Sequence, residues 1–252
     1  MKKTIYSFSR LAAVAVLLLL SIPVQASEMD SRIESTARQS YVFKTYLQGD
    51  DIKIESRDGA VTLTGVVSDS VNKSLAQETV AGLPGVKSVD NRLVSKGESS
   101  TANSDAWIRD KVKSTLLFHR SVNSYTTTVS VKDGIVTLRG LAQSEAQRDL
   151  TAEYAKDVEG VKGVNNEMIV AGTANKTQTI GETIDDASIT AQVKMTLLYH
   201  RSTSAINTKV ETNNGVVTIY GKAGSAAEKN LAGKYANDVN GVKGVKNWMN
   251  IE

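Results

Sequence analysis

The chain has 252 residues, of which 40% are hydrophobic, 23% charged and 5% aromatic, with no cysteine, two histidines and two prolines. This composition is typical of a globular protein and not of a disordered or collagen-like one. The absence of cysteine excludes disulfides, thiolate metal sites, a cysteine nucleophile and a lipid-carrying cysteine. Two histidines leave little room for a histidine-rich metal centre or a catalytic triad, and we expect neither a metal nor another cofactor.

The N-terminal segment has the three parts of a secretory signal peptide. A basic start over residues 2–10 precedes an apolar run over residues 11–22, and Val24-Gln25-Ala26 offers a small-x-small cleavage site. The run has about 12 residues, whereas a membrane-spanning helix needs about 20. We therefore predict a cleaved signal peptide over residues 1–26 and a periplasmic protein, with an uncleaved anchor as the alternative.

The charge of the mature chain speaks against nucleic acid as a partner. The full sequence carries 30 basic and 27 acidic side chains, a net charge of +3. Lys2, Lys3 and Arg10 leave with the signal peptide, so 27 basic and 27 acidic groups remain. A duplex-binding protein needs a concentrated cationic face to displace counterions, and the sequence has no such cluster.

One sequence unit occurs three times after the signal peptide. Residues 58–65, DGAVTLTG, recur as DGIVTLRG at 133–140 and as NGVVTIYG at 214–221, at offsets of 75 and then 81. Such internal self-similarity indicates one structural unit copied in tandem. Copies two and three are the more similar pair, with 32 of 67 aligned residues identical.

The copies define the domain organisation. We place three domains at residues 30–97, 105–172 and 186–252. The segments between them, 97–104 and 172–185, are rich in Ser, Thr, Asn and Gly, as flexible linkers are. The sequence therefore predicts three small domains that can move relative to one another.

Hydrophobic periodicity predicts how each copy begins. In copy two, Ile108, Val112 and Leu116 share one face of a helix, with Asp105 as its N-cap. Two strands of alternating pattern follow, joined by a hairpin turn at Asp133-Gly134.

A second helix and a last strand complete the copy. Residues 144–147, SEAQ, form a capping box at the start of the helix, and Gly160 ends it. The predicted buried stripe of this helix is Ala146, Leu150, Tyr154 and Val158. The order α-β-β-α-β predicts an α+β fold, in which each domain is a three-stranded sheet with two helices on one face.

The combined pattern resembles the BON-domain family. The motifs are (D/N)-G-x-V-x-L-x-G on the second strand and G-V-x-x-V-x-N before and within the last strand. In copy one they are carried by Gly59, Gly65, Gly85, Val86, Val89 and Asn91. The resemblance implies a non-enzymatic module of the bacterial cell envelope linked to osmotic stress, with phospholipid binding proposed for some members.

Glycines and asparagines that recur in every copy are expected to be structural, in turns, close packing and bonds to neighbouring backbone. The glycines are Gly59, Gly65, Gly85, Gly134, Gly140, Gly160, Gly215, Gly221 and Gly241, and the asparagines are Asn91, Asn166 and Asn247.

His119 and His200 occupy matching positions, each between an aromatic residue and an arginine, where copy one has Lys44. Zinc takes four ligands, and each copy offers a single histidine, so a metal site is the weakest interpretation. The simplest is a cation at a helix C-terminus, where it complements exposed carbonyls. A functional polar contact is the alternative.

Three aromatic residues are candidates for contact with a lipid surface or a protein partner. Trp107 lies off the apolar stripe of its helix, on the same flank as Phe118, and Trp248 lies in the last strand opposite the face of Met249. An amphipathic indole suits a partner protein or a membrane interface. Docking against a neighbouring domain of the same chain is the alternative.

Charge favours copy three for an anionic surface. This copy carries eight basic and five acidic side chains, a net charge of +3, while the other two copies balance. Each basic group near anionic lipid contributes about 1 kcal/mol. Lys243 and Lys246, close to Trp248 in sequence, are the candidates, although an ordinary solvated surface is the simpler interpretation, because the lysines are spread across the copy.

The sequence therefore predicts a binding protein and not an enzyme, since it has no G-x-S-x-G motif and no Walker-type loop. We expect a periplasmic envelope-maintenance protein that contacts phospholipid surfaces or envelope components through linked weak sites. The alternative is a periplasmic chaperone or assembly adaptor that holds clients at open strand edges. The sequence leaves the oligomeric state open.

Overall fold

The computed structural model describes residues 23–96, 103–122, 124–171, 183–203 and 208–252. The predicted signal peptide falls outside these residues except for its last four, and most of the two predicted linkers falls outside them too. Within the described ranges, no helix has the length and hydropathy needed to cross a membrane.

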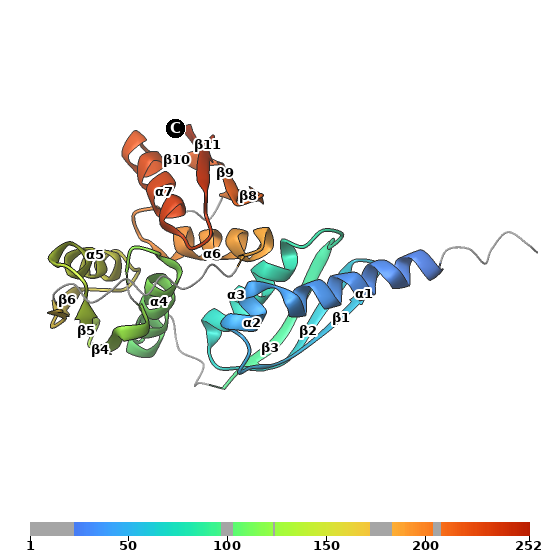
Figure 1. The fold of residues 1–252 in the computed structure, drawn as a ribbon, viewed down its shortest axis with the longest axis horizontal. Helices are drawn as coiled ribbons and strands as arrows, with labels where there is room; N and C mark the ends of the chain where they lie inside the picture. The colour runs from blue at the N-terminus through green and yellow to red at the C-terminus, as the bar shows by residue number, and fades with distance from the viewer. Residues whose placement is uncertain (1–22, 97–102, 123, 172–182, 204–207) are drawn as a thin grey trace, which may run out of the picture.

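Three domains of the same design follow one another along the chain (Figure 1). Domain 1 consists of α1 (Pro23–Gln39), α2 (Tyr41–Thr45), β1 (Asp51–Arg57), β2 (Ala60–Val67), α3 (Ser70–Ala81) and β3 (Ser88–Ser95). Domain 2 consists of α4 (Asp105–Phe118), the 3-10 turn η1 (Ser124–Thr126), β4 (Thr127–Lys132), β5 (Ile135–Ala142), α5 (Glu145–Lys156), β6 (Gly163–Asn166) and β7 (Ile169–Val170). Domain 3 consists of α6 (Asp186–Tyr199), β8 (Lys209–Asn213), β9 (Val216–Tyr220), β10 (Lys222–Ala223), α7 (Ala226–Asp238), β11 (Gly244–Asn247) and β12 (Asn250–Ile251). The predicted α+β class and the tandem repeat are confirmed.

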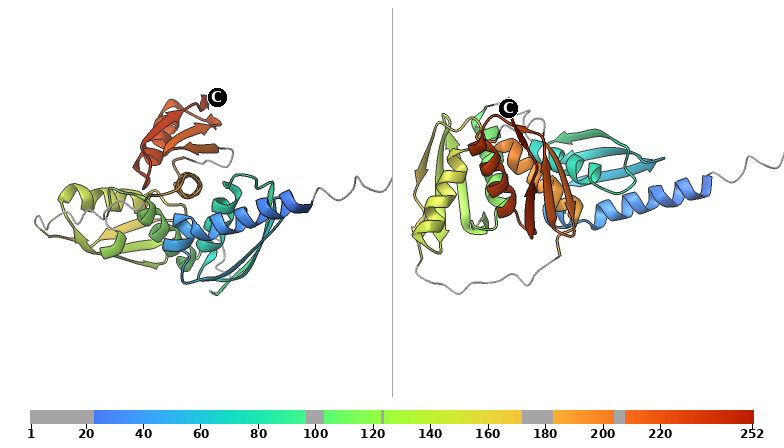
Figure 2. Two further views of the ribbon diagram at one scale, coloured as in Figure 1. Left: turned by 45° about the vertical axis from the view of Figure 1, so that its right-hand side comes forward. Right: turned by 90° about the horizontal axis from the view of Figure 1, so that it is seen from above.

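Each sheet is mixed, with the hairpin antiparallel and the last strand parallel to the middle one. In domain 1 the order is β1-β2-β3, and Leu63 of the middle strand faces Ile54 on one side and Asn91 on the other. The last strand of domains 2 and 3 is broken into two short pieces, of which β7 pairs with β5 and β12 with β10. The helices pack on one face of each sheet and leave its other face to solvent (Figure 2).

The hairpin turn is held by a carboxylate from the first helix. Asp105 accepts the backbone N–H of Asp133 at 2.7 Å and that of Gly134 at 2.8 Å. Both turn residues have positive φ, 55° and 81°, which glycine tolerates best. The prediction of Asp105 as N-cap is therefore wrong, because Ser104 caps the helix instead. Asp30 and Asp186 hold the turns of domains 1 and 3 in the same way.

Half of the predicted buried stripe of the second helix of domain 2 is confirmed. Tyr154 and Val158, the latter just beyond the helix end, are buried as predicted, whereas Ala146 is exposed and Leu150 is half-buried. Thr151 and Ala155, four residues apart on one face of the helix, complete the buried side.

The recurring asparagines tie the last strand to this helix. Asn166 donates from Nδ2 to the carbonyl of Arg148 at 2.8 Å and accepts the N–H of Met168 at 3.2 Å. Asn91 and Asn247 make the equivalent bonds in the other domains. All nine recurring glycines have positive φ.

Helix α6 lies between two hydrophobic cores and is buried on nearly every side. Its residues Ile189, Val193 and Leu197 belong to a core that runs through domains 2 and 3. Its residues Ala191 and Met195 belong to the core of domain 1. The expectation of domains that move relative to one another is therefore wrong, since α6 contributes to both cores. Figure 2 shows α6 between domain 1 and the strands of domain 3.

Polar bonds reinforce the contact between domain 1 and α6. The backbone N–H of Tyr41 donates to the Asp185 carboxylate at 2.7 Å, and that of Val42 donates to the hydroxyl of Ser188 at 3.1 Å. The isolated domain 3 would lose these bonds and expose the small residues of α6. Experiments on this protein accordingly need the full chain.

Replacing Ala191 by arginine is expected to detach domain 1 from the rest of the molecule. Ala191 is fully buried against domain 1 and takes no part in the core of domains 2 and 3. Overpacking alone costs about 1–3 kcal/mol, and a buried charge adds to it. Calorimetry should show one shared transition for the unmodified chain and a separate, lower transition for Ala191→Arg. Leu198→Arg, on the same helix but 49% exposed, is the control that should keep the single transition.

Candidate functional site

An aromatic pair lies on the outer face of the domain 3 sheet. The rings of Tyr220 and Trp248 meet edge to face, with centroids 5.6 Å apart and planes at 89°. Trp248 is 62% exposed, and Tyr220 is half-buried beside it. Neither ring belongs to the hydrophobic core that the described residues of the domain form.

Cationic groups surround this pair. Lys209 lies opposite Tyr220 in the β8–β9 register, and Lys246 lies opposite Thr218 on the same side of the sheet. Val217 and Ile219 of the middle strand point to the other side and are buried, as strand alternation requires. We call the surface formed by Lys209, Tyr220, Lys246 and Trp248 the Trp248 face.

Acidic residues neutralise only part of this charge. Glu211 pairs with Lys209 at 2.6 Å, and this hydrogen bond raises the pKa of Lys209 and lowers the pKa of Glu211. Glu252 pairs with Lys222 nearby. Lys246 has no ion-pair partner among the residues that the structure describes. An anion could therefore approach Lys246 without displacing an existing partner.

Domain 2 carries an ion pair at the two positions of the aromatic pair. Arg139 and Glu167, at the matching positions of that copy, form a salt bridge at 2.8 Å, with both side chains more than half exposed. The same fold is therefore built with either pair at this place, and the aromatic pair of domain 3 is not needed for the sheet.

The other candidate lysine lies apart from the aromatic pair. Lys243 is exposed at the hairpin end of domain 3, where its backbone N–H donates to the carbonyl of Gly215 at 2.8 Å. Its side chain covers the turn, since a Cβ on Gly215 would lie 3.0 Å from the Cδ atom of Lys243. The structure thus brings together Lys246 and Trp248 but gives Lys243 a packing contact of its own.

Trp107 packs inside the molecule. It is half-buried against the core of domains 2 and 3, and the Lys111 ammonium lies 3.5 Å from its ring centroid. The same ammonium lies 4.9 Å from the ring of Tyr199 in domain 3. Burial lowers the pKa of Lys111 to about 8, although the charge of Glu159 opposes the shift. This geometry corresponds to the docking alternative for Trp107.

Phe118 is not available to a membrane, which corrects its prediction as a contact residue. Its side chain is 1% exposed and lies in the core of domain 1, with its ring centroid 5.8 Å from that of Tyr46. Phe118, at the end of α4 in domain 2, therefore packs into domain 1 and connects the two domains.

The two histidines meet across the boundary of domains 2 and 3. Their Nε2 atoms are 3.2 Å apart, and both side chains are buried, at 1% exposure for His119 and 0% for His200. Their predicted role as cations over the carbonyls at the end of their own helices is wrong, because each imidazole reaches the other domain. Within the described ranges, no group of three or more His, Cys, Asp or Glu side chains is placed to hold a metal.

Each histidine faces an aspartate of the opposite domain. His200 Nδ1 lies 3.1 Å from Asp157 Oδ2 in hydrogen-bond geometry. His119 Nδ1 lies 3.2 Å from Asp238 Oδ2, at ion-pair distance but with poorer alignment. The two halves of the cluster therefore repeat each other across the boundary.

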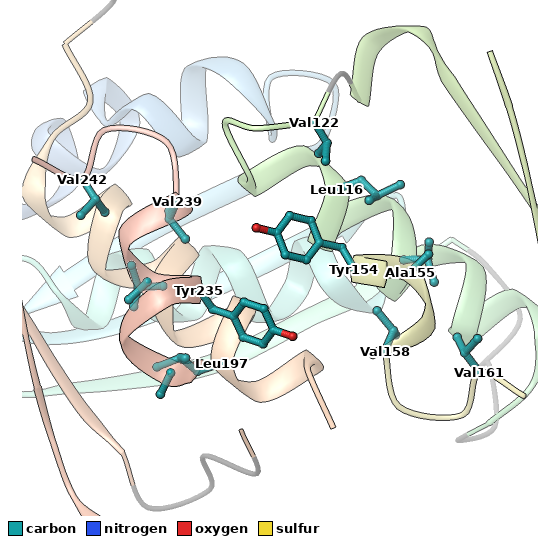
Figure 3. Close-up of a cluster of buried hydrophobic side chains, with 14 of the residues drawn as sticks. Leu116, Val122, Tyr154, Ala155, Val158, Val161, Leu197, Tyr235, Val239 and Val242 are labelled. Atoms are coloured by element: carbon teal, nitrogen blue, oxygen red, sulfur yellow. The ribbon is translucent and has the colours of Figure 1, made fainter. Parts of the chain in front are cut away.

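Two tyrosines complete the cluster, and Figure 3 shows their hydroxyl groups pointing in opposite directions across the boundary. Tyr154 donates to Asp238 at 2.7 Å, and Tyr235 donates to Asp157 at 2.8 Å. The pKa of both tyrosines is raised, first by burial and then by the carboxylate to which each hydroxyl donates. Both tyrosines therefore stay protonated and act as donors. We call these six residues, His119, Tyr154, Asp157, His200, Tyr235 and Asp238, the interdomain cluster.

A comparison with protein families decides the identity of the repeat. The family model described as "BON domain" matches residues 29–97, 104–172 and 185–252, which is most of the chain. The chain belongs to the BON-domain family.

Curated relatives of this BON-domain chain come from bacteria. "Osmotically-inducible protein Y" of Escherichia coli is 34% identical over 143 residues, which cover 57% of this chain and 70% of the relative. "Outer membrane lipoprotein DolP" of Haemophilus influenzae is 30% identical over 141 residues, which cover 55% of this chain and 66% of the relative. Among solved structures, the C-terminal domain of CdsD from Chlamydia trachomatis covers 93% of this chain and 100% of its own, at 17% identity and a TM-score of 0.24.

The sequence held two signals for residues that its analysis missed. Counting outward from the Asn214-Gly215 turn pairs residue 209 with residue 220, so Lys209 and Tyr220 could have been placed on one BON sheet face. The histidines, tyrosines and aspartates of the interdomain cluster match between copies two and three, whereas copy one has Lys44, Thr79 and Gly82 in their places. A set shared by two copies alone indicates that those two copies pair.

Proposed function

We propose that this protein is a non-enzymatic component of the bacterial cell envelope that contacts anionic phospholipid surfaces through the Trp248 face. The names of its relatives, one osmotically inducible and one an outer membrane lipoprotein, support an envelope and stress role. These 252 residues contain no cysteine that could carry a lipid, and the contact that we propose is made by the folded surface of the protein.

The observation that carries the proposal is the exchange of a salt bridge for an aromatic pair. Natural sheets cover their solvent faces with polar groups, and domain 2 does so with Arg139 and Glu167. In domain 3 the same positions hold Tyr220 and Trp248, beside Lys246, for which the described part of the chain supplies no ion-pair partner. Tyrosine and tryptophan are the residues enriched at the membrane–water interface, and lysine adds attraction to anionic headgroups.

The proposal is tested by giving domain 3 the pair of domain 2. The double variant Tyr220→Arg with Trp248→Glu should keep the fold, because domain 2 already accommodates that ion pair. Flotation of the full chain with vesicles of phosphatidylcholine and phosphatidylglycerol at low salt should show binding by the unmodified chain and a loss of at least tenfold in the double variant. Lys246→Gln should weaken binding roughly fivefold, the equivalent of about 1 kcal/mol.

A matched control separates the Trp248 face from apolar exposure in general. Leu141→Gln removes an exposed apolar residue of domain 2 without adding charge and should leave flotation unchanged. Absence of flotation by the unmodified chain would refute the lipid proposal. Suppression of client aggregation that is insensitive to vesicle charge would instead support a chaperone or assembly adaptor.

A further inference from the structure

The neighbours of the histidine pair in the interdomain cluster determine how many hydrogens the two rings carry. Imidazole has two ring nitrogens, and a neutral ring carries hydrogen on only one of them. In this protein all four nitrogens of His119 and His200 have a polar neighbour: Nδ1 of each faces a carboxylate, and the two Nε2 atoms face each other. The hydrogen count therefore follows from what each neighbour accepts.

The carboxylates fix the hydrogen at Nδ1. Burial acts to raise the pKa of Asp157, but hydrogen bonds from His200, Ser202 and Tyr235 outweigh it and hold the pKa below its ordinary value. An ionised carboxylate only accepts, so the nitrogen that faces it must donate. The same reasoning applies to His119.

The pKa of the other carboxylate, Asp238, is likewise lowered. Burial opposes this shift, but the hydrogen bonds from Ser121 and Tyr154 and the His119 ring at ion-pair distance together outweigh it. Arg120 adds a positive charge 3.9 Å from the same carboxylate. Both Nδ1 atoms therefore carry hydrogen, and any hydrogen on Nε2 is an extra proton.

Only one extra proton fits between the two Nε2 atoms. With none, two lone pairs face each other across 3.2 Å. With two, the hydrogens point at each other in the same gap, and two positive rings adjoin. With one, the atoms form an N–H···N hydrogen bond of ordinary length.

We propose that His119 and His200 share one proton at neutral pH, and that a second proton, added on acidification, opens the contact between domains 2 and 3. The inference rests on the geometry of the cluster and does not depend on the proposed function.

Besides the carboxylates of Asp157 and Asp238, the described cluster offers the two imidazoles no other acceptor for a ring hydrogen. Tyr154 stacks on His119 with ring centroids 4.0 Å apart, and Tyr235 stacks on His200 at 3.9 Å. Arg201, the other charged group beside the pair, donates to the carbonyl of Lys156. The pKa of His200 is lowered, chiefly by burial and also by the charge of His119, although Asp157 acts to raise it. This direction agrees with resistance to a second proton.

Four backbone hydrogen bonds across the boundary would report the opening. Arg120 N–H donates to the carbonyl of Asp238, and Arg201 N–H to that of Asp157, at 2.9 and 2.7 Å. The other two run from the N–H of Asn240 to Phe118 and from that of Glu159 to Tyr199, at 2.9 and 3.1 Å. These amides exchange with solvent only when the domains part.

The first test follows the protons directly by nitrogen-15 NMR of the full chain labelled at histidine. The chain has only two histidines, so every labelled ring signal comes from this pair and the ring hydrogens can be counted directly. At pH 7 we expect three ring hydrogens over four nitrogens, and coupled titration of the two rings. Independent titration of both rings near the ordinary histidine pKa, or two bare Nε2 atoms at pH 7, would overturn the proposal.

The second test measures the opening. Protection of the four boundary amides, corrected for intrinsic exchange rates, should fall at least tenfold between pH 7 and pH 5, while amides in the β1–β2 hairpin of domain 1 keep theirs. The double variant His119→Gln with His200→Gln should lose this pH dependence. Unchanged protection of the unmodified chain at pH 5, with the second proton bound, would show that the pair is no switch.

Discussion

Replacing Asp157 by alanine is expected to destabilise the protein by about 3 kcal/mol, because it leaves a buried cluster without its acceptor. Three donors from domain 3 converge on this carboxylate: His200, Ser202 and Tyr235. For a unit of 150–250 residues, a loss of 1 kcal/mol lowers the Tm by about 2–4 °C, so calorimetry should show a fall of roughly 6–12 °C.

An exposed aspartate on α5, the helix that Asp157 caps, supplies the control. Asp149 is 66% exposed and contacts Arg148 beside it, so Asp149→Ala should change the stability by less than about 0.5 kcal/mol. An equal, small effect of the two substitutions would contradict the importance of the cluster for joining domains 2 and 3.

The effect of Asp157→Ala should also depend on pH in a definite direction. The pKa of Asp157 is lowered in the folded protein, so its contribution is present above the unfolded value of about 3.9 and is lost as the pH falls through the folded value. The difference in Tm between the unmodified chain and the variant should therefore persist from pH 7 down to about pH 4 and shrink as the pH falls further.

Local physics made the fold of one unit predictable from sequence. Turn glycines, alternating strands and helix caps are local signals, and each of them occurs in all three copies of the unit. Errors arose where a side chain serves a distant segment. Asp105 satisfies the rule for an N-cap by its position, but its carboxylate reaches a turn 28 residues away.

The relations between the domains could not be predicted in the same way. Polar linkers are typical of mobile domains, and they say nothing about whether the domain surfaces fit together. Helix α6 did hold a clue, since Ala187, Ala191 and Met195 give it a second apolar face in addition to its core stripe. A helix that is apolar all round is buried all round, and this one is buried between two domains.

In the candidate site, too, the residues that depend on local sequence could be predicted, and those that depend on distant segments could not. Trp248 could be placed on an exposed face by strand alternation alone, whereas its partner Tyr220 required the register of a second strand. Phe118 was misplaced because its exposure depends on domain 1, which lies far away in sequence.

Replacing Gly140 by alanine is expected to cost more than about 3 kcal/mol, since the backbone itself blocks the new side chain. Gly140 has a φ of +135°, and a Cβ built there would lie 1.8 Å from the carbonyl oxygen of Thr126. This backbone oxygen directly precedes the paired strand β4 and cannot rotate away, so β4 must separate from β5. Gly244 is the matched control, because a Cβ there meets nothing within 4 Å, and Gly244→Ala should be near neutral.

The pattern of unfolding in the glycine variants distinguishes shared cores from independent domains. Damage from Gly140→Ala begins in domain 2, but the core of that domain continues into domain 3. Amide exchange in β8 and β9 should therefore accelerate together with exchange in β4 and β5, because loss of one half removes the packing of the other. The equivalent Gly65→Ala, whose Cβ would lie 1.9 Å from the carbonyl oxygen of Asp51, starts from domain 1 and should reach α6 first. If each substitution accelerated exchange only within its own domain, the three units would be independent after all, and the burial of α6 between two cores would have no energetic consequence.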